Sequence, residues 1–383
     1  MRSKLYILTF FILLSVTAFG QTITIGHIHY QLMPGAKAIV VQGQYEGHIT
    51  IPEKIKYQDQ LYTVEEIGYA AFNEAAGLIS VKLPNTIHTI RQRAFGDCKI
   101  LKEINIPSSV ERLEGAVFAN CTSLTSIYLP RSVAFIGQYA FSGCERLASI
   151  EVDKHNQHFT ASDGILYDKE MKVLIKVPDS RASYTFPSSV TSFLTEAFEG
   201  NKNIKAIDLP GTVKSIPHHA FLNCSSLRVF HIPANVELIG LSAFNGCDAM
   251  TSFTVDERNR QYSSVDGILY NYDKTILIKC PETRSEVTIA KSVTAIESWA
   301  FFRCKKLAEI TLPESVTKIG MSAFVQCDAL KTLKILSGKQ VDMKGSIFAG
   351  RTKAVTVLVP EAVISTYRNS SNLDIKELNY QAY

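Results

Sequence analysis

The sequence predicts a β-rich solenoid built from repeated 23-residue units. A phenylalanine recurs at that interval through most of the 383-residue chain, residues at fixed offsets from it are apolar, and a proline recurs at one further offset. A period of about 20–50 residues is typical of stacked supersecondary units, so we expect function on an extended surface rather than in one cleft. The recurring phenylalanines are Phe72, Phe95, Phe118, Phe141, Phe198, Phe221, Phe244, Phe301 and Phe324.

Four columns of apolar residues accompany this phenylalanine. Val or Ile stands eight residues before it, and Ile, Leu or Phe five before it. Leu, Ile or Met follows six residues after it, and Val, Ile, Leu or Phe nine after it. No charged residue enters these columns, so we expect them to form the core. A 23-residue unit is too small to fold alone, and its neighbours must cover its open faces.

Each unit is expected to contain a short strand, a turn, a second extended piece and a tight corner. Residues 124–130 read Leu-Thr-Ser-Ile-Tyr-Leu-Pro, and this alternation is typical of a strand with one buried face. The proline ends the strand because it has no N–H to donate to a ladder. The corner is the Ala-Phe pair that closes most units.

Two gaps interrupt the period. The interval from Phe141 to Phe198 and that from Phe244 to Phe301 each exceed one unit by the same 34-residue segment. The added segments match each other, since both contain Asp-Gly-Ile-Leu-Tyr, at 163–167 and at 266–270. An Asp-Gly turn, an apolar run, a charged turn and a second apolar run predict a β-hairpin in each 34-residue insert. We expect each hairpin to leave the stack and to be covered at its edge by a neighbour.

The ends of the chain differ from the middle. Residues 1–20 combine Arg2 and Lys4 with an apolar run and small residues before Gln21, which predicts a secretory signal peptide. Residues 21–60 are expected to form an N-terminal cap, 61–354 the solenoid and 355–383 a C-terminal cap. Caps are needed because an open solenoid end exposes core and unpaired strand edges. No transmembrane span is expected in the mature chain, because no apolar run reaches the roughly 20 residues required.

The cysteines also form a column. Seven of the eight stand three residues after the recurring phenylalanine. Such a column favours small buried thiols that pack like apolar side chains. Neighbouring rungs lie about 4.8 Å apart, so distance alone leaves a disulfide open, although parallel side chains make it awkward. A separation of one whole unit disfavours zinc, whose ligands typically stand two to four positions apart. The seven are Cys98, Cys121, Cys144, Cys224, Cys247, Cys304 and Cys327.

The repeat carries a family resemblance. The unit reads Cys-x2-Leu-x2-Ile-x-Leu-Pro-x-Ser-Val-x2-Ile-x3-Ala-Phe, and with the Asp-Gly-Ile-Leu-Tyr segments it resembles the BspA-like bacterial leucine-rich repeat family over roughly residues 50–350. The resemblance implies a leucine-rich repeat array that is curved and rich in β-structure. It also implies a secreted or cell-surface protein of a host-associated, anaerobic bacterium, and several members are described as adhesins.

No catalytic set or cofactor motif is evident. A nucleophile elbow, a P-loop, a His-Glu-x2-His motif and a Gly-rich dinucleotide turn are all absent. We therefore expect a protein that is not an enzyme, with no catalytic residues, no cofactor and no metal site. The formal net charge is +4, and removing Arg2 and Lys4 with the signal peptide leaves +2. That balance is too small for an electrostatic nucleic-acid binder.

Exposed columns hold the binding candidates. Two residues before and ten residues after the phenylalanine, the residue type varies freely from unit to unit. Aromatic residues, Arg and His in such columns are candidate contacts for an extracellular protein or glycan: Trp299, Tyr139, Tyr128, His219 and Arg93. Two functions remain open. One is a secreted or cell-surface, adhesin-like binding module, and the other is a periplasmic or envelope scaffold for other bacterial proteins.

Overall fold

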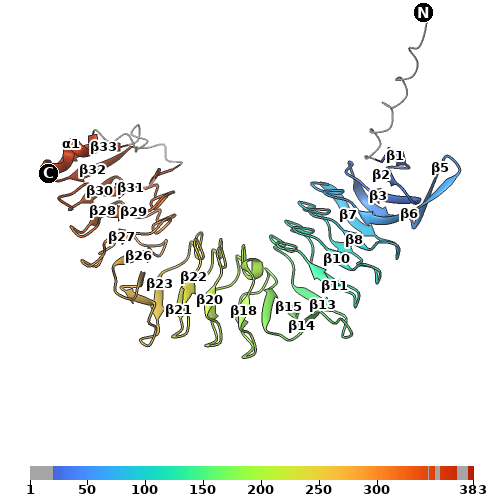
Figure 1. Cartoon of the computed structure of the whole chain (residues 1–383), viewed down its shortest axis with the longest axis horizontal. Helices are drawn as coiled ribbons and strands as arrows, with labels where there is room; N and C mark the ends of the chain where they lie inside the picture. Colours follow the sequence, from blue (N-terminus) through green and yellow to red (C-terminus); the bar gives the residue numbers. More distant parts are fainter. Residues whose placement is uncertain (1–19, 344, 350–353, 369–377) are drawn as a thin grey trace, which may run out of the picture. The chain divides into compact units, whose positions relative to one another are not determined.

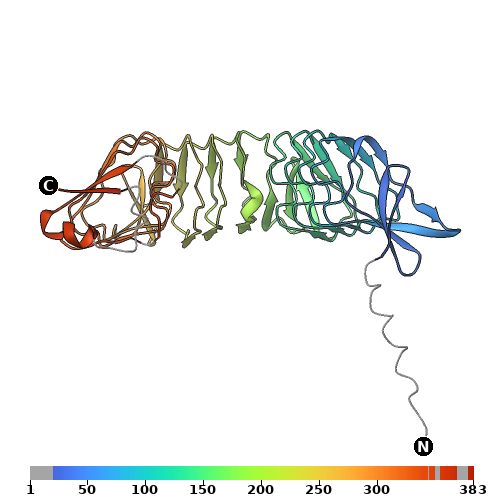
Figure 2. The same ribbon diagram turned by 90° about the horizontal axis from the view of Figure 1, so that it is seen from above.

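The computed structural model describes residues 20–343, 345–349, 354–368 and 378–383. Apart from Gly20, the predicted signal peptide lies outside these residues. The chain divides into two compact units, Met1–Cys144 with Val152–His158 and Glu145–Glu151 with Phe159–Tyr383. Within each unit, successive short strands stack rung upon rung (Figures 1 and 2). The predicted solenoid of 23-residue repeats is confirmed.

The first unit contains two kinds of ladder. One sheet has the order β1-β2-β3-β6-β8-β10-β12, with β5 paired to β6, and the other has the order β4-β7-β9. From β3 onward the main ladder is parallel, because each unit repeats the same path. The strands are β1 (Thr22–Ile25), β2 (Ile28–Met33), β3 (Lys37–Val40), β4 (Glu46–Thr50), β5 (Lys54–Tyr57), β6 (Gln60–Ile67), β7 (Gly77–Lys82), β8 (Thr89–Ile90), β9 (Glu103–Ile104), β10 (Arg112–Leu113), β11 (Ser126–Leu129) and β12 (Phe135–Ile136).

The second unit repeats this plan, and its described residues include two short 3-10 helices and one α-helix. Two of its sheets are parallel throughout, with the orders β17-β19-β21-β23 and β28-β30-β32-β33. Its elements, with β13 at the boundary, are β13 (Ser149–Val152), β14 (Phe159–Ser162), β15 (Ile165–Asp168), β16 (Val173–Lys176), β17 (Tyr184–Thr185), β18 (Ser192–Phe193), η1 (Thr195–Ala197), β19 (Ala206–Asp208), β20 (Ser215–Ile216), β21 (Val229–Ile232), β22 (Leu238–Ile239), β23 (Ser252–Val255), β24 (Tyr262–Val265), β25 (Ile268–Asn271), β26 (Ile276–Lys279), β27 (Ala295–Ile296), β28 (Glu309–Leu312), β29 (Lys318–Ile319), β30 (Thr332–Ile335), β31 (Asp342–Met343), β32 (Val355–Val359), η2 (Glu361–Val363), α1 (Ile364–Arg368) and β33 (Leu378–Ala382).

The two added segments are antiparallel three-stranded meanders. β15 pairs antiparallel with β14 and β16, and β25 pairs in the same way with β24 and β26. Each last strand then pairs parallel with the next short strand, β16 with β18 and β26 with β27. The expectation that the hairpins leave the stack is therefore wrong. Leu174 and Leu277 at their centres are completely buried, so these strands must lie in the core as rungs.

The apolar columns form the core. In the column eight residues before the phenylalanine, no side chain is more than 1% exposed. The phenylalanine rings stack from unit to unit, and the centroids of Phe72 and Phe95 lie 5.0 Å apart with an interplanar angle of 12°. Three column members, Ile104, Ile136 and Ile239, are only partly buried. Ile136 and Ile239 stand in the units that directly precede the two added segments.

The cysteine column lies in the core. All eight cysteines are free and buried. In most units the thiol donates a hydrogen bond to the carbonyl of the phenylalanine in the preceding unit, as from Cys98 to Phe72 at 3.0 Å and from Cys121 to Phe95 at 3.1 Å. Burial raises the pKa of the Cys98 thiol to about 12. The thiols are therefore packing groups with very little thiolate at neutral pH.

Thiol titration tests this arrangement. The native protein is expected to react slowly with a thiol reagent, because its thiols are buried and protonated. Unfolding in denaturant without reductant is expected to release all eight thiols of the chain. A count of two or fewer after unfolding would instead mean that the cysteine ladder is oxidised.

The segments predicted to be caps contain the first and last strands of the described part of the chain. Strands β1, β2 and β3 form an antiparallel meander within residues 21–60, and β3 continues parallel to β6. At the other end, β33 pairs parallel with β32. We propose that these segments act as caps that cover the terminal rungs.

Candidate functional site

The residue two positions before the repeating phenylalanine, here called the corner column, has a left-handed backbone. In eight of the 23-residue repeats, the backbone φ of this residue lies between +51° and +63°. Hydrogen bonds between units hold this shape, as from the amide of Arg93 to the carbonyl of Gly115 at 3.0 Å. Glu196 is the exception, because it lies in the 3-10 helix η1. The eight residues are Ala70, Arg93, Ala116, Tyr139, His219, Ser242, Trp299 and Ser322.

Backbone energetics do not explain which residues fill the corner column. Left-handed φ costs an L-residue roughly 1–2 kcal/mol, and Gly, Asn or Asp tolerate it best. None of these three occupies a left-handed corner position, whereas Arg93, Tyr139, His219 and Trp299 do. Bulky side chains held in this region are outliers that point to a role other than stability.

Four of the five predicted site residues belong to this column. In the first compact unit, Tyr139 is 37% exposed. Arg93 is half-buried, and its guanidinium lies 3.1 Å from the carboxylate of Asp97. In the second unit, His219 is exposed and Trp299 is half-buried. The column is not uniformly exposed as expected, since Ala70, Glu196 and Ser322 are buried under their neighbours.

Tyr128 lies apart from the corner column, in strand β11. It is 48% exposed, and its hydroxyl donates a hydrogen bond to Asp153 Oδ2 at 2.9 Å. Backbone and tyrosine hydrogen bonds to Asp153 lower the pKa of this carboxyl. Arg93 and Tyr139 share one column two units apart, about 10 Å at the spacing of adjacent strands. The five residues therefore form no single constellation in either unit.

The short-strand ladder of the second unit is interrupted twice, between β18 and β20 and between β22 and β26. Strands β20 and β22 pair only with each other, and the next short-strand ladder begins again with β26 and β27. At the second break, after β22, the amide of Ile239 donates to the hydroxyl of Tyr262 at 2.8 Å instead of to a neighbouring strand. The second added segment causes the break, because it supplies a meander where an ordinary unit would supply a corner.

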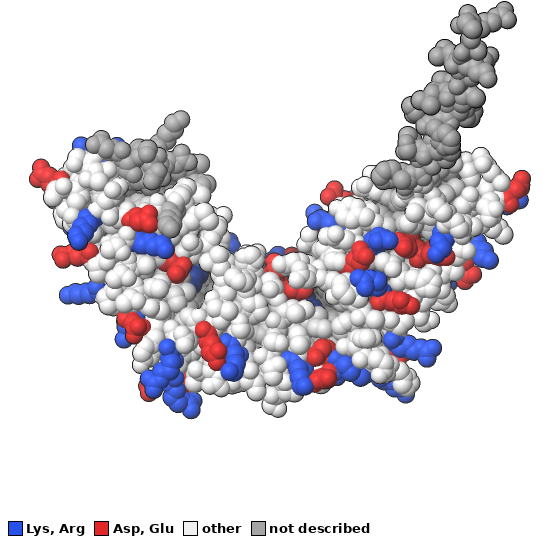
Figure 3. Space-filling model, viewed as in Figure 1, with Lys and Arg blue, Asp and Glu red and all other residues white. Residues whose placement is uncertain are grey.

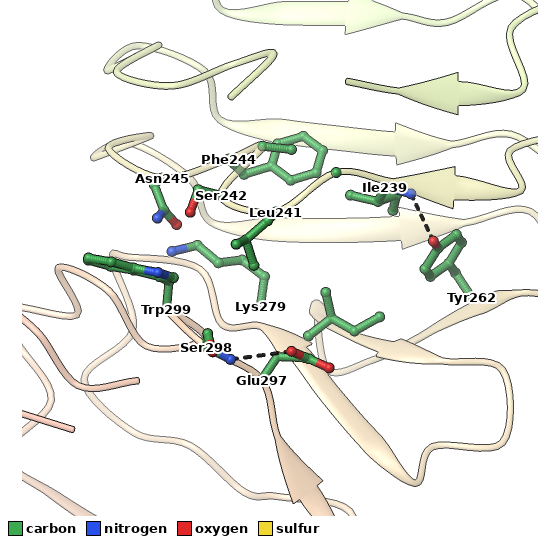
Figure 4. A pocket seen from close by; sticks show the side chains of 13 residues that line it. Ile239, Leu241, Ser242, Phe244, Asn245, Tyr262, Lys279, Glu297, Ser298 and Trp299 are labelled. Carbon is green, nitrogen blue, oxygen red and sulfur yellow. Dashed lines mark hydrogen bonds between the residues drawn. The ribbon is translucent and has the colours of Figure 1, made fainter. Parts of the chain in front are cut away.

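A pocket of about 320 Å³ lies at this interruption, and we call it the break pocket. Figure 4 shows the amide of Asn245, the hydroxyl of Ser242 and the ammonium of Lys279 converging beside the ring of Trp299. The Trp299 ring is supported from behind by an edge contact with Phe302, at a centroid distance of 5.4 Å. The lining residues are 239–245, Tyr262, Ile278, Lys279 and 297–299.

A buried ion pair supports the pocket. Lys279 Nζ lies 3.3 Å from Glu282 Oε1, and both side chains are almost inaccessible. Glu282 Oε1 also accepts a hydrogen bond from the Gly246 amide at 2.8 Å. In ordinary units the amides of this turn donate to a carbonyl of the next corner, as Asn223 does to Asn245. The carboxylate thus replaces a missing carbonyl, and burial raises its pKa although the Lys279 ammonium lowers it in part.

Charge is dispersed over the surface. Figure 3 shows acidic and basic side chains interspersed on the face that it displays, without a large field of one sign. Among the described residues, no cluster of three or more His, Cys, Asp or Glu side chains is placed to hold a metal ion. None of the helices in the described part of the chain has the length and hydropathy to cross a bilayer.

Sequence reasoning identified Trp299 but missed the other polar residues of the break pocket. Asn245 stands one residue after the phenylalanine, outside the two columns that held the predicted contacts, and Lys279 lies in an added segment that was predicted only to form a hairpin. The sequence signal that could have indicated this pocket was the gap in the 23-residue period. Where a corner is missing, either a hollow remains or another segment fills its place. Which outcome applies depends on packing, which the spacing alone does not determine.

Comparison with known proteins places this architecture. The family profile described as BspA type Leucine rich repeat region (6 copies) matches residues 49–163, 179–265 and 278–382. A leucine rich cell surface protein from Faecalibacterium prausnitzii A2-165 is 26% identical, with 95% of each chain covered and a TM-score of 0.50. A leucine-rich repeat protein from Eubacterium ventriosum is 22% identical, with 80% of this chain and 95% of that chain covered and a TM-score of 0.55. No curated protein matches the chain. The profile covers most of the sequence, and the chain belongs to the BspA type leucine-rich repeat family.

Proposed function

We propose that this protein is an exported interaction module that binds a protein or glycan outside the cell, in an adhesin-like role for a host-associated bacterium. The corner column is the observation that carries this proposal. A constant left-handed backbone presents Arg, Tyr, His and Trp in different units, at a cost in stability that Gly would avoid. Such a surface varies its chemistry while its geometry stays the same, which suits recognition of a large partner.

The cellular location proposed here has two supports. The first is the secretory signal predicted for residues 1–20. The second is the similarity to the F. prausnitzii chain, which is described as a cell surface protein. We propose no catalytic role, because the solenoid presents variable side chains and the sequence contains none of the common catalytic motifs.

Binding assays with matched variants test the proposal. Immobilised extracellular-matrix proteins and a glycan array are probed with the mature protein, with an Arg93→Ala/Tyr128→Ala/Tyr139→Ala variant and with a His219→Ala/Trp299→Ala variant. At least one variant is expected to lose affinity by tenfold or more, because binding energy concentrates in a few aromatic and Arg side chains. Leu238→Ala, at a position that is 57% exposed, is the control and is expected to bind as the parent does.

Corner glycine variants provide a second check. Tyr139→Gly and His219→Gly are expected to leave the melting temperature unchanged or raised, because Gly relieves the left-handed strain while the exposed side chain contributes little packing. Absence of any retained partner, or unchanged binding by both alanine variants, would contradict the proposal. In that case the envelope scaffold becomes the better hypothesis, and surface proteolysis of intact cells decides whether the protein is accessible from outside.

A further inference from the structure

The break pocket contains a polar side chain that the surrounding chain leaves unused. Asn245 is only 5% exposed, and its side-chain amide has no hydrogen-bond partner among the described residues. Its hydrogen-bonding atoms are not sealed from solvent, because Asn245 lies on the lining of the pocket. Figure 4 shows this amide directed into the pocket, toward Lys279 and Trp299. An amide that lies on a pocket wall and has no partner in the described part of the fold is matched to a ligand that carries its own polar atoms.

Trp299 supplies an apolar wall next to this amide. Its backbone has φ +63°, and the edge contact with Phe302 holds the ring in place. An indole face carries negative potential, so it attracts groups whose exposed edges are weakly positive. The C–H groups on one face of a pyranose ring meet this description, and the hydroxyls around that ring meet the amide and hydroxyl groups of the pocket.

The charges of the pocket favour a neutral ligand. The Lys279 ammonium is already paired with Glu282 at 3.3 Å, so it adds no net positive charge. Glu297 is exposed at the rim, where its carboxylate would repel an anionic group. The volume of about 320 Å³ is near the lower end of the range of about 300–1,000 Å³ for small-molecule sites. The pocket therefore suits one small neutral unit rather than a bulky or acidic one.

We propose that the break pocket is a glycan subsite that takes one neutral hexopyranose unit, stacked on Trp299 and hydrogen-bonded by Asn245 and Ser242. This inference rests on the proposed function, since it names the class of partner that one part of the surface binds. A peptide is the competing occupant, because its carbonyls could also satisfy the amide. The polyol is favoured by the combination of an aromatic wall with an amide and a hydroxyl beside it (Figure 4).

The fluorescence of the chain reports on this pocket directly. Trp299 is the only tryptophan of the protein, so its emission reads one site. The mature protein is titrated with methyl glucoside, methyl galactoside, methyl mannoside and N-acetylglucosamine, and with glycerol as a non-specific polyol. At least one sugar is expected to shift the emission saturably, with a dissociation constant on the order of 1 mM for so small a ligand, and glycerol is expected not to.

Two variants separate binding from folding. Asn245→Ala keeps the tryptophan and removes an amide that has no partner in the described part of the fold, so it is expected to fold normally and to bind the same sugar about tenfold more weakly. Trp299→Ala, followed by calorimetry, is expected to abolish binding while the melting temperature changes little. Tyr272→Ala, at a position 43% exposed and outside the pocket lining, is the control and is expected to bind as the parent does.

The outcomes distinguish this inference from the proposed function. Emission that no sugar shifts, or a shift that Asn245→Ala leaves unchanged, overturns the glycan subsite. A protein partner that shifts the emission while no sugar does so assigns the pocket to a protein interface, which overturns the subsite and leaves the interaction module standing. Retention of sugar binding together with failure of the matrix-protein assays supports the subsite and narrows the proposed partner to glycans.

Discussion

Replacing Phe221 by alanine is expected to lower the free energy of unfolding by about 3–5 kcal/mol, the range for deleting a buried aromatic side chain. Phe221 has no exposed surface, and its ring lies between Phe198 and Phe244 at centroid distances of 5.2 and 5.5 Å. It also contacts Phe230 at 4.9 Å. The cavity left by alanine would separate two stacked units, so collapse of the surroundings can recover little of the loss.

Urea denaturation of the parent protein and of Phe221→Ala measures this loss of unfolding free energy. Leu238→Ala serves as the control, since that side chain is 57% exposed and its removal is expected to change stability by less than about 1 kcal/mol. Equal losses for the two variants would mean that the assignment of inside and outside columns is wrong.

Replacing Lys176 by methionine is expected to cost about 3–5 kcal/mol, because the variant leaves a buried carboxylate without its partner. Lys176 Nζ lies 2.6 Å from Asp179 Oδ1, and each side chain is only 2% exposed. The same substitution at Lys214 is the matched control. Its ion pair with Glu237 is 3.1 Å long but 70% and 62% exposed, so we expect a loss below about 1 kcal/mol.

The cost of Lys176→Met is also expected to depend on pH. Burial already raises the pKa of Asp179 in the native protein although the Lys176 ammonium lowers it in part, and removing that ammonium raises the pKa further. A carboxyl that binds its proton more tightly in the folded state loses stability as the pH rises from its unfolded pKa, about 3.9, through its folded value. Unfolding curves are therefore expected to show a smaller loss near pH 4 than at pH 8.

A double variant distinguishes a lost ion pair from lost packing. Lys176→Met with Asp179→Leu replaces both charges by apolar groups, which is often neutral or stabilising. Most of the stability is expected to return. A double variant as unstable as Lys176→Met alone would show that the methylene groups of the lysine, and not its charge, carry the contribution.

The sequence by itself determined the repeat and the core, and it placed the cysteines in one buried column. The columns that never contain a charged residue are the ones that can face the core of each repeat, because a charge at such a position would be buried without a partner. Val110 and Val213 illustrate this, since both were assigned to the core from their column and both are fully buried. The corner column was also identified by its variability, and with it Trp299 as a candidate contact.

Only the tertiary structure decided what happens where the repeat is interrupted. The spacing showed that a 34-residue segment is added at each gap, but whether β26 leaves the stack or joins it depends on which edge its hydrogen bonds can reach. The left-handed corner was likewise invisible, because Arg, Tyr, His and Trp carry no local signal for positive φ. The break pocket arises from both features, the added segment that joins the stack and the left-handed corner. Asn245, Lys279 and Trp299 come from separate stretches of chain, and only the packing of the meander against two corners brings them together.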